Sequence, residues 1–222
     1  DLNWRNPDLR RAVFSSIKFW LDRGVDGFRL DVVNGYFKDA QLRDNPPRFT
    51  LNPLTIEMQR QKRIYDCDQP ELFDVYREFR ALLDSYSERG SVGEVMGDDP
   101  KRVASYVGKD KLHMAFNFGF THQPWRPLAF QQAITAWDSA VAPDAWPCYV
   151  LSNHDITRHV TRLGAGPLAD ERAKVAAALL LTLRGTPFLY MGEEIAMRSP
   201  RIARKDLADP YDKRLWPFHK GR

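Results

Sequence analysis

Apolar and polar residues alternate along the chain in a pattern that predicts helices separated by short strands. From residue 7 the segment PDLRRAVFSSIKFWL begins with a proline and places apolar residues near a 3.6-residue period, until Gly24 ends it. Trp20 falls among these apolar positions, so we expect it to be a core residue. The following run, 27–33, is apolar with polar interruptions and is bounded by glycine, as is typical of a buried strand.

The same pairing of a helix with a strand recurs four more times. The expected helices are 72–89, 100–107, 128–141 and 171–184, and the expected strands are 91–95, 112–120, 148–152 and 187–191. Helices that alternate with single strands indicate right-handed crossover units around a parallel sheet. The pattern therefore predicts an α/β fold, and no linker divides the chain into two domains.

One stretch breaks the alternation. Residues 34–69 are polar and irregular, with Asn45-Pro46-Pro47 and Asn52-Pro53 as breakers. A connection of this length inside a compact domain is usually functional, so we expect it to shape the mouth of a site.

Composition and charge exclude several classes of protein. With 43% apolar and 12% aromatic residues the chain can build a core, which excludes a disordered segment and a disulfide miniprotein. The longest apolar run, 175–181, is too short to cross a membrane, and the first residues do not resemble a signal peptide. The 33 basic and 29 acidic residues are interspersed, so no basic stripe indicates nucleic acid. We expect no nucleic-acid or membrane partner and a cytoplasmic location.

The positions of the cysteine and histidine residues do not predict a metal site. Cys67 and Cys148 lie far apart without a CxxC motif, and we expect both to be reduced thiols. His113 and His122 have no carboxylate partner in sequence, and we expect His159 and His219 at the surface; we assign none of them to a metal. The chain starts at Asp-Leu-Asn and stops without a terminating signal, so we expect it to be a piece of a longer protein.

Charged residues follow the predicted strands at the ends where parallel α/β sheets bind ligands. Arg29 and Asp31 project to one face of the first strand, Glu94 ends the second, and His154 with Asp155 follows the fourth. Each has an ordinary structural explanation by itself, such as an ion pair between Arg29 and Asp31. Together they indicate a shared acidic pocket. Two carboxylates in one pocket suit glycoside cleavage, in which one attacks the anomeric carbon and the other protonates the leaving oxygen.

Three segments resemble signature blocks of glycoside hydrolase family 13, the α-amylase family: DGFRLDVV at 26–33, GEV at 93–95 and SNHD at 152–155. The opening Asp-Leu-Asn resembles the end of a further block, QPDLN, of the oligo-1,6-glucosidase and α-glucosidase branch, and GTPFLYMGEE at 185–194 resembles its eighth barrel strand. The resemblance implies a partial (β/α)₈ TIM barrel, with strands four to eight and their helices within 1–222. It implies that the first three strands, an excursion domain and a C-terminal β-domain lie outside this chain, and that the rest of the protein is needed to complete the barrel.

The resemblance also implies roles for individual residues. Asp31 matches the family's nucleophile, Glu94 its general acid/base and Asp155 the third acid, which holds sugar hydroxyls in the transition state. Arg29 resembles the arginine that orients the nucleophile, and His154 the histidine that contacts the same sugar.

Three further residues are candidates for substrate binding. Arg222 matches an arginine that recognises the non-reducing end. Phe120 matches an aromatic wall near the leaving-group subsite, with a core phenylalanine as the equal alternative. Val32, directly after Asp31, resembles the α-1,6-acting members more than the α-1,4-acting ones.

The function that follows is a retaining, exo-acting α-glucosidase that acts on short α-glucosides without a cofactor. Two alternatives stay open: a glucosyl isomerase or transglucosylase such as trehalose synthase or sucrose isomerase, and a non-catalytic amylase-like interaction protein.

Overall fold

The computed structural model describes residues 2–49, 60–164, 166–214 and 216. The chain forms two compact units. Unit 1 comprises the chain up to Phe116 together with Ala136–Pro147, and unit 2 comprises Asn117–Thr135 and the chain from Cys148 onward.

Unit 1 is built on a three-stranded parallel sheet in the order β1-β2-β3. Its strands are β1 (Gly27–Leu30), β2 (Gly90–Gly93) and β3 (Met114–Ala115). Gly27 pairs with Gly90 and Leu30 with Gly93, so the carboxyl ends of β1 and β2 lie level. Only glycine fits at position 27, because a Cβ there would collide with the carbonyl group of Gly90.

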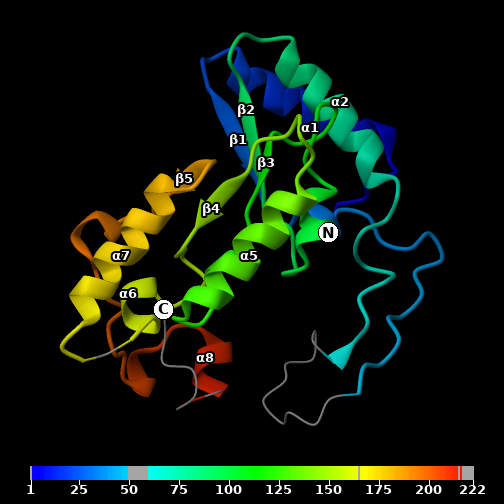
Figure 1. The fold of residues 1–222 in the computed structure, drawn as a ribbon. Helices are drawn as coiled ribbons and strands as arrows, with labels where there is room; N and C mark the ends of the chain where they lie inside the picture. Colours follow the sequence, from blue (N-terminus) through cyan, green and yellow to red (C-terminus); the bar gives the residue numbers. More distant parts are fainter. Residues whose placement is uncertain (1, 50–59, 165, 215, 217–222) are drawn as a thin grey trace. The chain divides into compact units, whose positions relative to one another are not determined.

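Unit 1 also contains the helices α1 (Pro7–Leu21), α2 (Leu72–Asp84) and the short α3 (Pro100–Ala104). The α1 helix begins at Pro7 because the side chain of Asn6 accepts a hydrogen bond from the Asp8 amide at 2.9 Å. Both long helices pack beside the β1–β2 pair (Figure 1), and Phe28 of β1 meets Phe79 of α2 with ring centroids 6.3 Å apart.

Unit 2 contains a two-stranded parallel sheet of β4 (Cys148–Val150) and β5 (Thr186–Phe188), with Cys148 opposite Thr186 and Val150 opposite Phe188. The connection between these strands carries α6 (His159–Arg162) and α7 (Ala169–Thr182) (Figure 1). Further helices are α4 (Phe118–Thr121), α5 (Pro127–Ala140), whose last residues belong to unit 1, and α8 (Pro210–Arg214). Helices and parallel strands thus alternate as the sequence predicts.

Some expectations were wrong in detail. The strand expected at 112–120 is confined to Met114–Ala115, because the Asn117 side chain accepts a hydrogen bond from the Phe120 amide at 3.1 Å and starts α4. Trp20 is 52% exposed, since it lies at the edge of the apolar stripe of α1 whose centre faces the sheet. His159 is buried, not superficial.

Other features agree with expectation. Cys67 and Cys148 are both buried free thiols. The connection after β1 is irregular apart from the short 3-10 helix η1 (Val33–Gly35). Within the part of the chain that the structure describes, no helix has the length and apolarity needed to cross a membrane.

Candidate active site

One guanidinium joins the two acids that end neighbouring strands of unit 1. Nη1 of Arg29 lies 3.0 Å from Oδ1 of Asp31, and Nη2 of the same side chain contacts Oε2 of Glu94. Asp31 directly follows β1 and Glu94 directly follows β2. The parallel register therefore brings together the three residues that the sequence placed at these strand ends.

The backbone of Glu94 extends the β1–β2 pairing by one residue. Its amide donates to the carbonyl of Leu30 at 2.9 Å, and its carbonyl accepts from the amide of Val33 at 2.8 Å. The Glu94 side chain is 15% exposed, whereas that of Asp31 is 71% exposed. The two acids thus differ in environment, with Glu94 the more enclosed.

The turn that follows Asp31 is strained. Val32 adopts left-handed backbone angles, φ 44° and ψ 50°, which a β-branched residue rarely does. The neighbouring Val33 is fully buried, and its carbonyl accepts a hydrogen bond from the hydroxyl of Tyr76 on α2. Contacts on both sides of the turn therefore hold the unusual conformation directly after the acid.

A cavity of about 200 Å³ in unit 1 reaches Arg29 and Asp31. It is walled by apolar side chains of α1, β1 and α2 and by two aromatic rings, Trp4 and Tyr36, which stack with centroids 5.2 Å apart. Burial, reinforced by the charge of Asp31 and opposed by Arg29, raises the pKa of Tyr36 to about 12. Tyr36 therefore remains a neutral phenol beside the acid at physiological pH.

In unit 2, the loop after β4 carries Asp155 and His154. Nε2 of His154 lies 3.4 Å from Oδ2 of Asp155, and both side chains are largely exposed. The side chain of Asn153 shapes this loop, because its oxygen accepts from the amides of Asp155 at 2.9 Å and Ile156 at 3.1 Å.

A buried polar cluster lies beneath the same loop. The Oγ of Ser152 is 3.1 Å from Nδ1 of His159, whose backbone amide donates back to that Oγ at 2.9 Å. Nδ1 of His159 is also 3.3 Å from a carboxylate oxygen of Glu193. These contacts explain why His159 is buried, and they tie the Asp155 loop to the segment after β5.

The remaining substrate-binding candidates differ in placement. Phe120 is fully buried and packs edge-to-face on Phe130 and Tyr149, with centroids 5.3 and 5.1 Å away, which supports its core alternative. Arg222 lies outside the described residues, as does His219.

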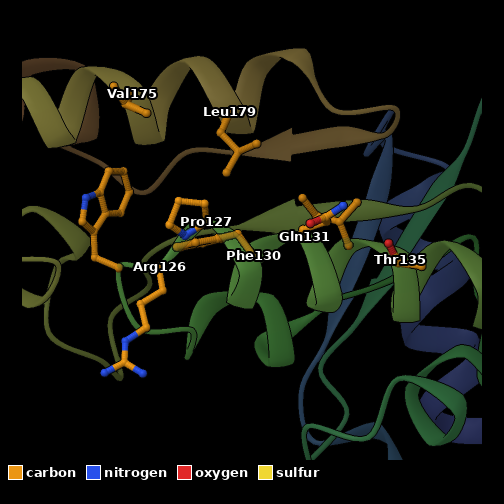
Figure 2. Close-up of a pocket in the computed structure, with 9 residues that line it drawn as sticks. Arg126, Pro127, Phe130, Gln131, Thr135, Val175 and Leu179 are labelled. Atoms are coloured by element: carbon orange, nitrogen blue, oxygen red, sulfur yellow. The ribbon is translucent and has the colours of Figure 1, made fainter.

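A larger cavity, of about 430 Å³, lies in unit 2. Figure 2 shows Val175 and Leu179 of α7 on one side of it and Pro127, Phe130 and Gln131 of α5 on the other. Its lining is mainly apolar, whereas a sugar needs polar partners, so it does not extend the candidate active site. Among the residues described, no cluster of three or more His, Cys, Asp or Glu could hold a metal ion.

Sequence reasoning missed Tyr36 and Asn34 as residues of this site. Asn34 is fully buried and contacts the segment after Glu94. In sequence it begins the pair Asn34-Gly35, which is typical of a turn. The only signal that could have marked these residues is their closeness to the two strand ends.

A family model described as "Alpha amylase, catalytic domain" matches residues 1–216. A probable alpha-glucosidase of Rhizobium meliloti (strain 1021) is 40% identical over 235 residues, covering 100% of this chain and 42% of that protein. An oligo-1,6-glucosidase of Parageobacillus thermoglucosidasius is 33% identical over 216 residues, covering 91% of this chain and 37% of that protein.

Among solved structures, the alpha-glucosyl transfer enzyme XgtA superposes with a TM-score of 0.91 at 37% identity, covering 100% of this chain and 43% of that one. The chain thus spans less than half the length of the proteins that it matches.

Proposed function

Because this chain belongs to the α-amylase catalytic-domain family, we propose that it is part of a retaining, exo-acting α-glucosidase that removes terminal glucose from short α-glucosides. The fold class predicted from the sequence is confirmed, since the catalytic domain of this family is a (β/α)₈ barrel and the chain alternates helices with parallel strands. We further propose that 1–222 supplies strands four to eight of one such barrel and that the remainder of the protein completes it.

The observation that carries the proposal is the contact of Arg29 with both Asp31 and Glu94 at adjacent strand ends. In this mechanism Asp31 attacks the anomeric carbon while Glu94 donates its proton to the leaving oxygen, which gives a covalent glucosyl-enzyme. Glu94, now a carboxylate, then removes a proton from water, and the water oxygen displaces Asp31 from the sugar. Arg29 orients Asp31 throughout.

The other candidates bind the substrate in this proposal. Asp155 and His154 hold hydroxyls of the terminal glucose, and Arg222 recognises its non-reducing end. Phe120 is the exception: it is fully buried, so it supports the core of unit 2 and does not contact the sugar. Val32 sets the linkage, and replacing it by Ala is expected to raise activity on maltose relative to isomaltose.

The decisive experiment is Asp31→Asn in the full-length protein. We expect the turnover of an aryl α-glucoside to fall by more than roughly 10⁴-fold, because the amide is a poor nucleophile. Asp26→Asn is the matched control, since Asp26 precedes the same strand but its side chain is 92% exposed. Near-normal turnover of Asp31→Asn would refute the assignment. A ligand complex should also show the Asp31 and Glu94 carboxyl groups about 5 to 5.5 Å apart, as in retaining enzymes.

Glucosyl transfer is the second candidate, favoured by the likeness to an alpha-glucosyl transfer enzyme. It uses the same acids, but a sugar hydroxyl replaces water in the second step. Product analysis on maltose and on sucrose separates the alternatives: hydrolysis releases free glucose, whereas transfer or isomerisation yields new disaccharides or longer sugars. A non-catalytic interaction protein would bind sugar without turnover.

A cytoplasmic location is also part of the proposal. Both cysteines are free and buried, which suits a reducing compartment. Fractionation of cells that express the full-length protein would test the location.

A further inference from the structure

We propose that Asn34 is a positioning residue that holds Glu94 in place for proton transfer. This inference rests on the proposed function, because it assumes that Glu94 is the general acid. The inference goes beyond the proposed function because it assigns a role to a residue that acts through the backbone beside Glu94 and not through the substrate.

The side-chain amide of Asn34 is fully buried, and both its nitrogen and its oxygen make hydrogen bonds. Its oxygen accepts from the backbone amide of Met96 at 2.9 Å. Its nitrogen donates to the carbonyl of Met96 at 3.2 Å and to Oδ1 of Asp68 at 3.3 Å. The side chain thus pairs with Met96 as a neighbouring strand would, by exchanging two hydrogen bonds with one residue.

This pairing begins where the sheet ends. The β2 strand stops at Gly93, and Glu94 makes the last two backbone hydrogen bonds of the ladder, with Leu30 and Val33. Met96 is two residues further on, and Gly97 then turns the chain away with φ 122°. Asn34 therefore fixes the backbone on the far side of Glu94, so that the residue carrying the acid is held from both directions.

Asn34 is itself held by Asp68. The Asp68 amide donates to the Asn34 carbonyl at 2.8 Å, and Oδ1 of Asp68 accepts from the Tyr106 hydroxyl at 2.7 Å. Oδ2 of Asp68 pairs with Arg102 of α3. These contacts fix the Asp68 side chain on both of its oxygens, so Asp68 can hold Asn34 and, through it, the backbone beside Glu94.

The role predicts a particular kinetic signature. A misplaced general acid slows reactions whose leaving group needs a proton and spares those whose leaving group departs without one. An alkyl glucoside needs the proton, whereas α-glucosyl fluoride does not. A purely structural defect lowers both rates together, and partial unfolding cancels in their ratio because both are measured on one preparation.

The experiment measures kcat and KM of full-length Asn34→Ala on methyl α-glucoside and on α-glucosyl fluoride. We expect kcat on the methyl glucoside to fall roughly 100-fold, as misplacement by about 1 Å can cost this much. On the fluoride we expect a fall below roughly threefold, since the acid contributes little there. KM should change little for either substrate.

A second variant keeps the size of the side chain. In Asn34→Asp the oxygen can still accept from Met96, but a carboxylate would face the Met96 carbonyl and Asp68, so we expect the same signature. Asn6→Ala is the control: it removes an amide that caps α1 and lowers stability without contact to the Glu94 segment. Its two rates should fall equally, if at all.

Glu94→Gln, measured beside them, separates the two possible failures. If Glu94→Gln slows the methyl glucoside selectively but both Asn34 variants leave the ratio of the two rates at the wild-type value, the inference about Asn34 is overturned and the proposed function stands. If Glu94→Gln slows the two substrates equally, Glu94 is not the general acid, and both the proposed function and the inference about Asn34 are overturned. Selective loss in Glu94→Gln and in the Asn34 variants supports both.

Discussion

At the scale of single residues, Arg29 satisfies two carboxylates at once. Only the planar fork of an arginine presents two nitrogens in fixed directions, whereas a lysine offers one compact charge. In Arg29→Lys we therefore expect Asp31 and Glu94 to lose their common partner, and kcat on an aryl α-glucoside to fall roughly 100-fold.

The matched control for this variant is Arg23→Lys. Arg23 is exposed after α1 and lies over the ring of Phe19 of that helix. We expect it to retain wild-type kcat. Equal rates for Arg29→Lys and Arg23→Lys would show that the shared contact has no part in turnover.

The two thiols give a second test at this scale. Burial raises the pKa of Cys67 to about 11 and that of Cys148 to about 12, so both stay protonated at neutral pH. Since the thiolate is the reactive form, N-ethylmaleimide at pH 7 should modify neither residue in the folded protein and both in denaturant. Intact-mass spectrometry counts the adducts. Rapid labelling of native Cys67 or Cys148 would contradict the burial seen here.

At the scale of elements, the loop after η1 depends on one carboxylate. Hydrogen bonds from Arg43 lower the pKa of Asp39 from its ordinary value of 3.8 to about 2. A carboxyl group with a depressed pKa in the folded state stabilises that state above its unfolded pKa, and this contribution disappears as the pH falls through the folded pKa. We therefore expect the Asp39 contribution to be constant above about pH 4 and lost by about pH 2.

Chemical denaturation between pH 2 and 6 measures this effect as the difference between wild type and Asp39→Asn. The difference in unfolding free energy should shrink as the pH falls. A difference that does not vary with pH would show that the Asp39–Arg43 contact is not formed in solution.

The elements also show what the sequence can and cannot predict. The α1 helix was predicted almost to the residue, because its signals are local: Pro7 at the start, the Asn6 cap and Gly24 at φ 88°. The strand expected at 112–120 was too long, since an apolar run does not reveal that the Asn117 side chain turns the backbone into α4.

The candidate site follows the same division. Asp31 and Glu94 could be placed because each directly follows a strand, and parallel pairing brings such positions together. The role of Asn34 could not be predicted, because it depends on contacts with Met96 and Asp68. These residues are distant in sequence, and the contacts form only in the folded chain.

At the scale of the whole molecule, the chain covers about two fifths of the proteins that it matches. Among the described strands β1 pairs on one side only, and apolar side chains such as Phe19 and Leu181 are 46% and 57% exposed. Open strand edges and apolar surface favour association. Residues 1–222 expressed alone should therefore aggregate or unfold over a broad range of temperature.

Size-exclusion chromatography and calorimetry test this expectation. A monomer with one sharp unfolding transition would contradict it, since cooperative melting indicates a self-sufficient core. The full-length protein, treated in parallel, should melt cooperatively.

The close approach of Gly27 to Gly90 has a consequence for how substitutions are tolerated. Any side chain at position 27 must force β1 and β2 apart, so its penalty falls on folding and hence on how much protein accumulates in the cell. Under the proposed function, a substitution at Asp31, exposed beyond the other end of the same strand, is expected to spare accumulation and to remove activity. A screen that scores abundance and activity separately would therefore find that substitutions at Gly27 lower abundance. Substitutions at Asp31, only four residues away, would lower activity at normal abundance.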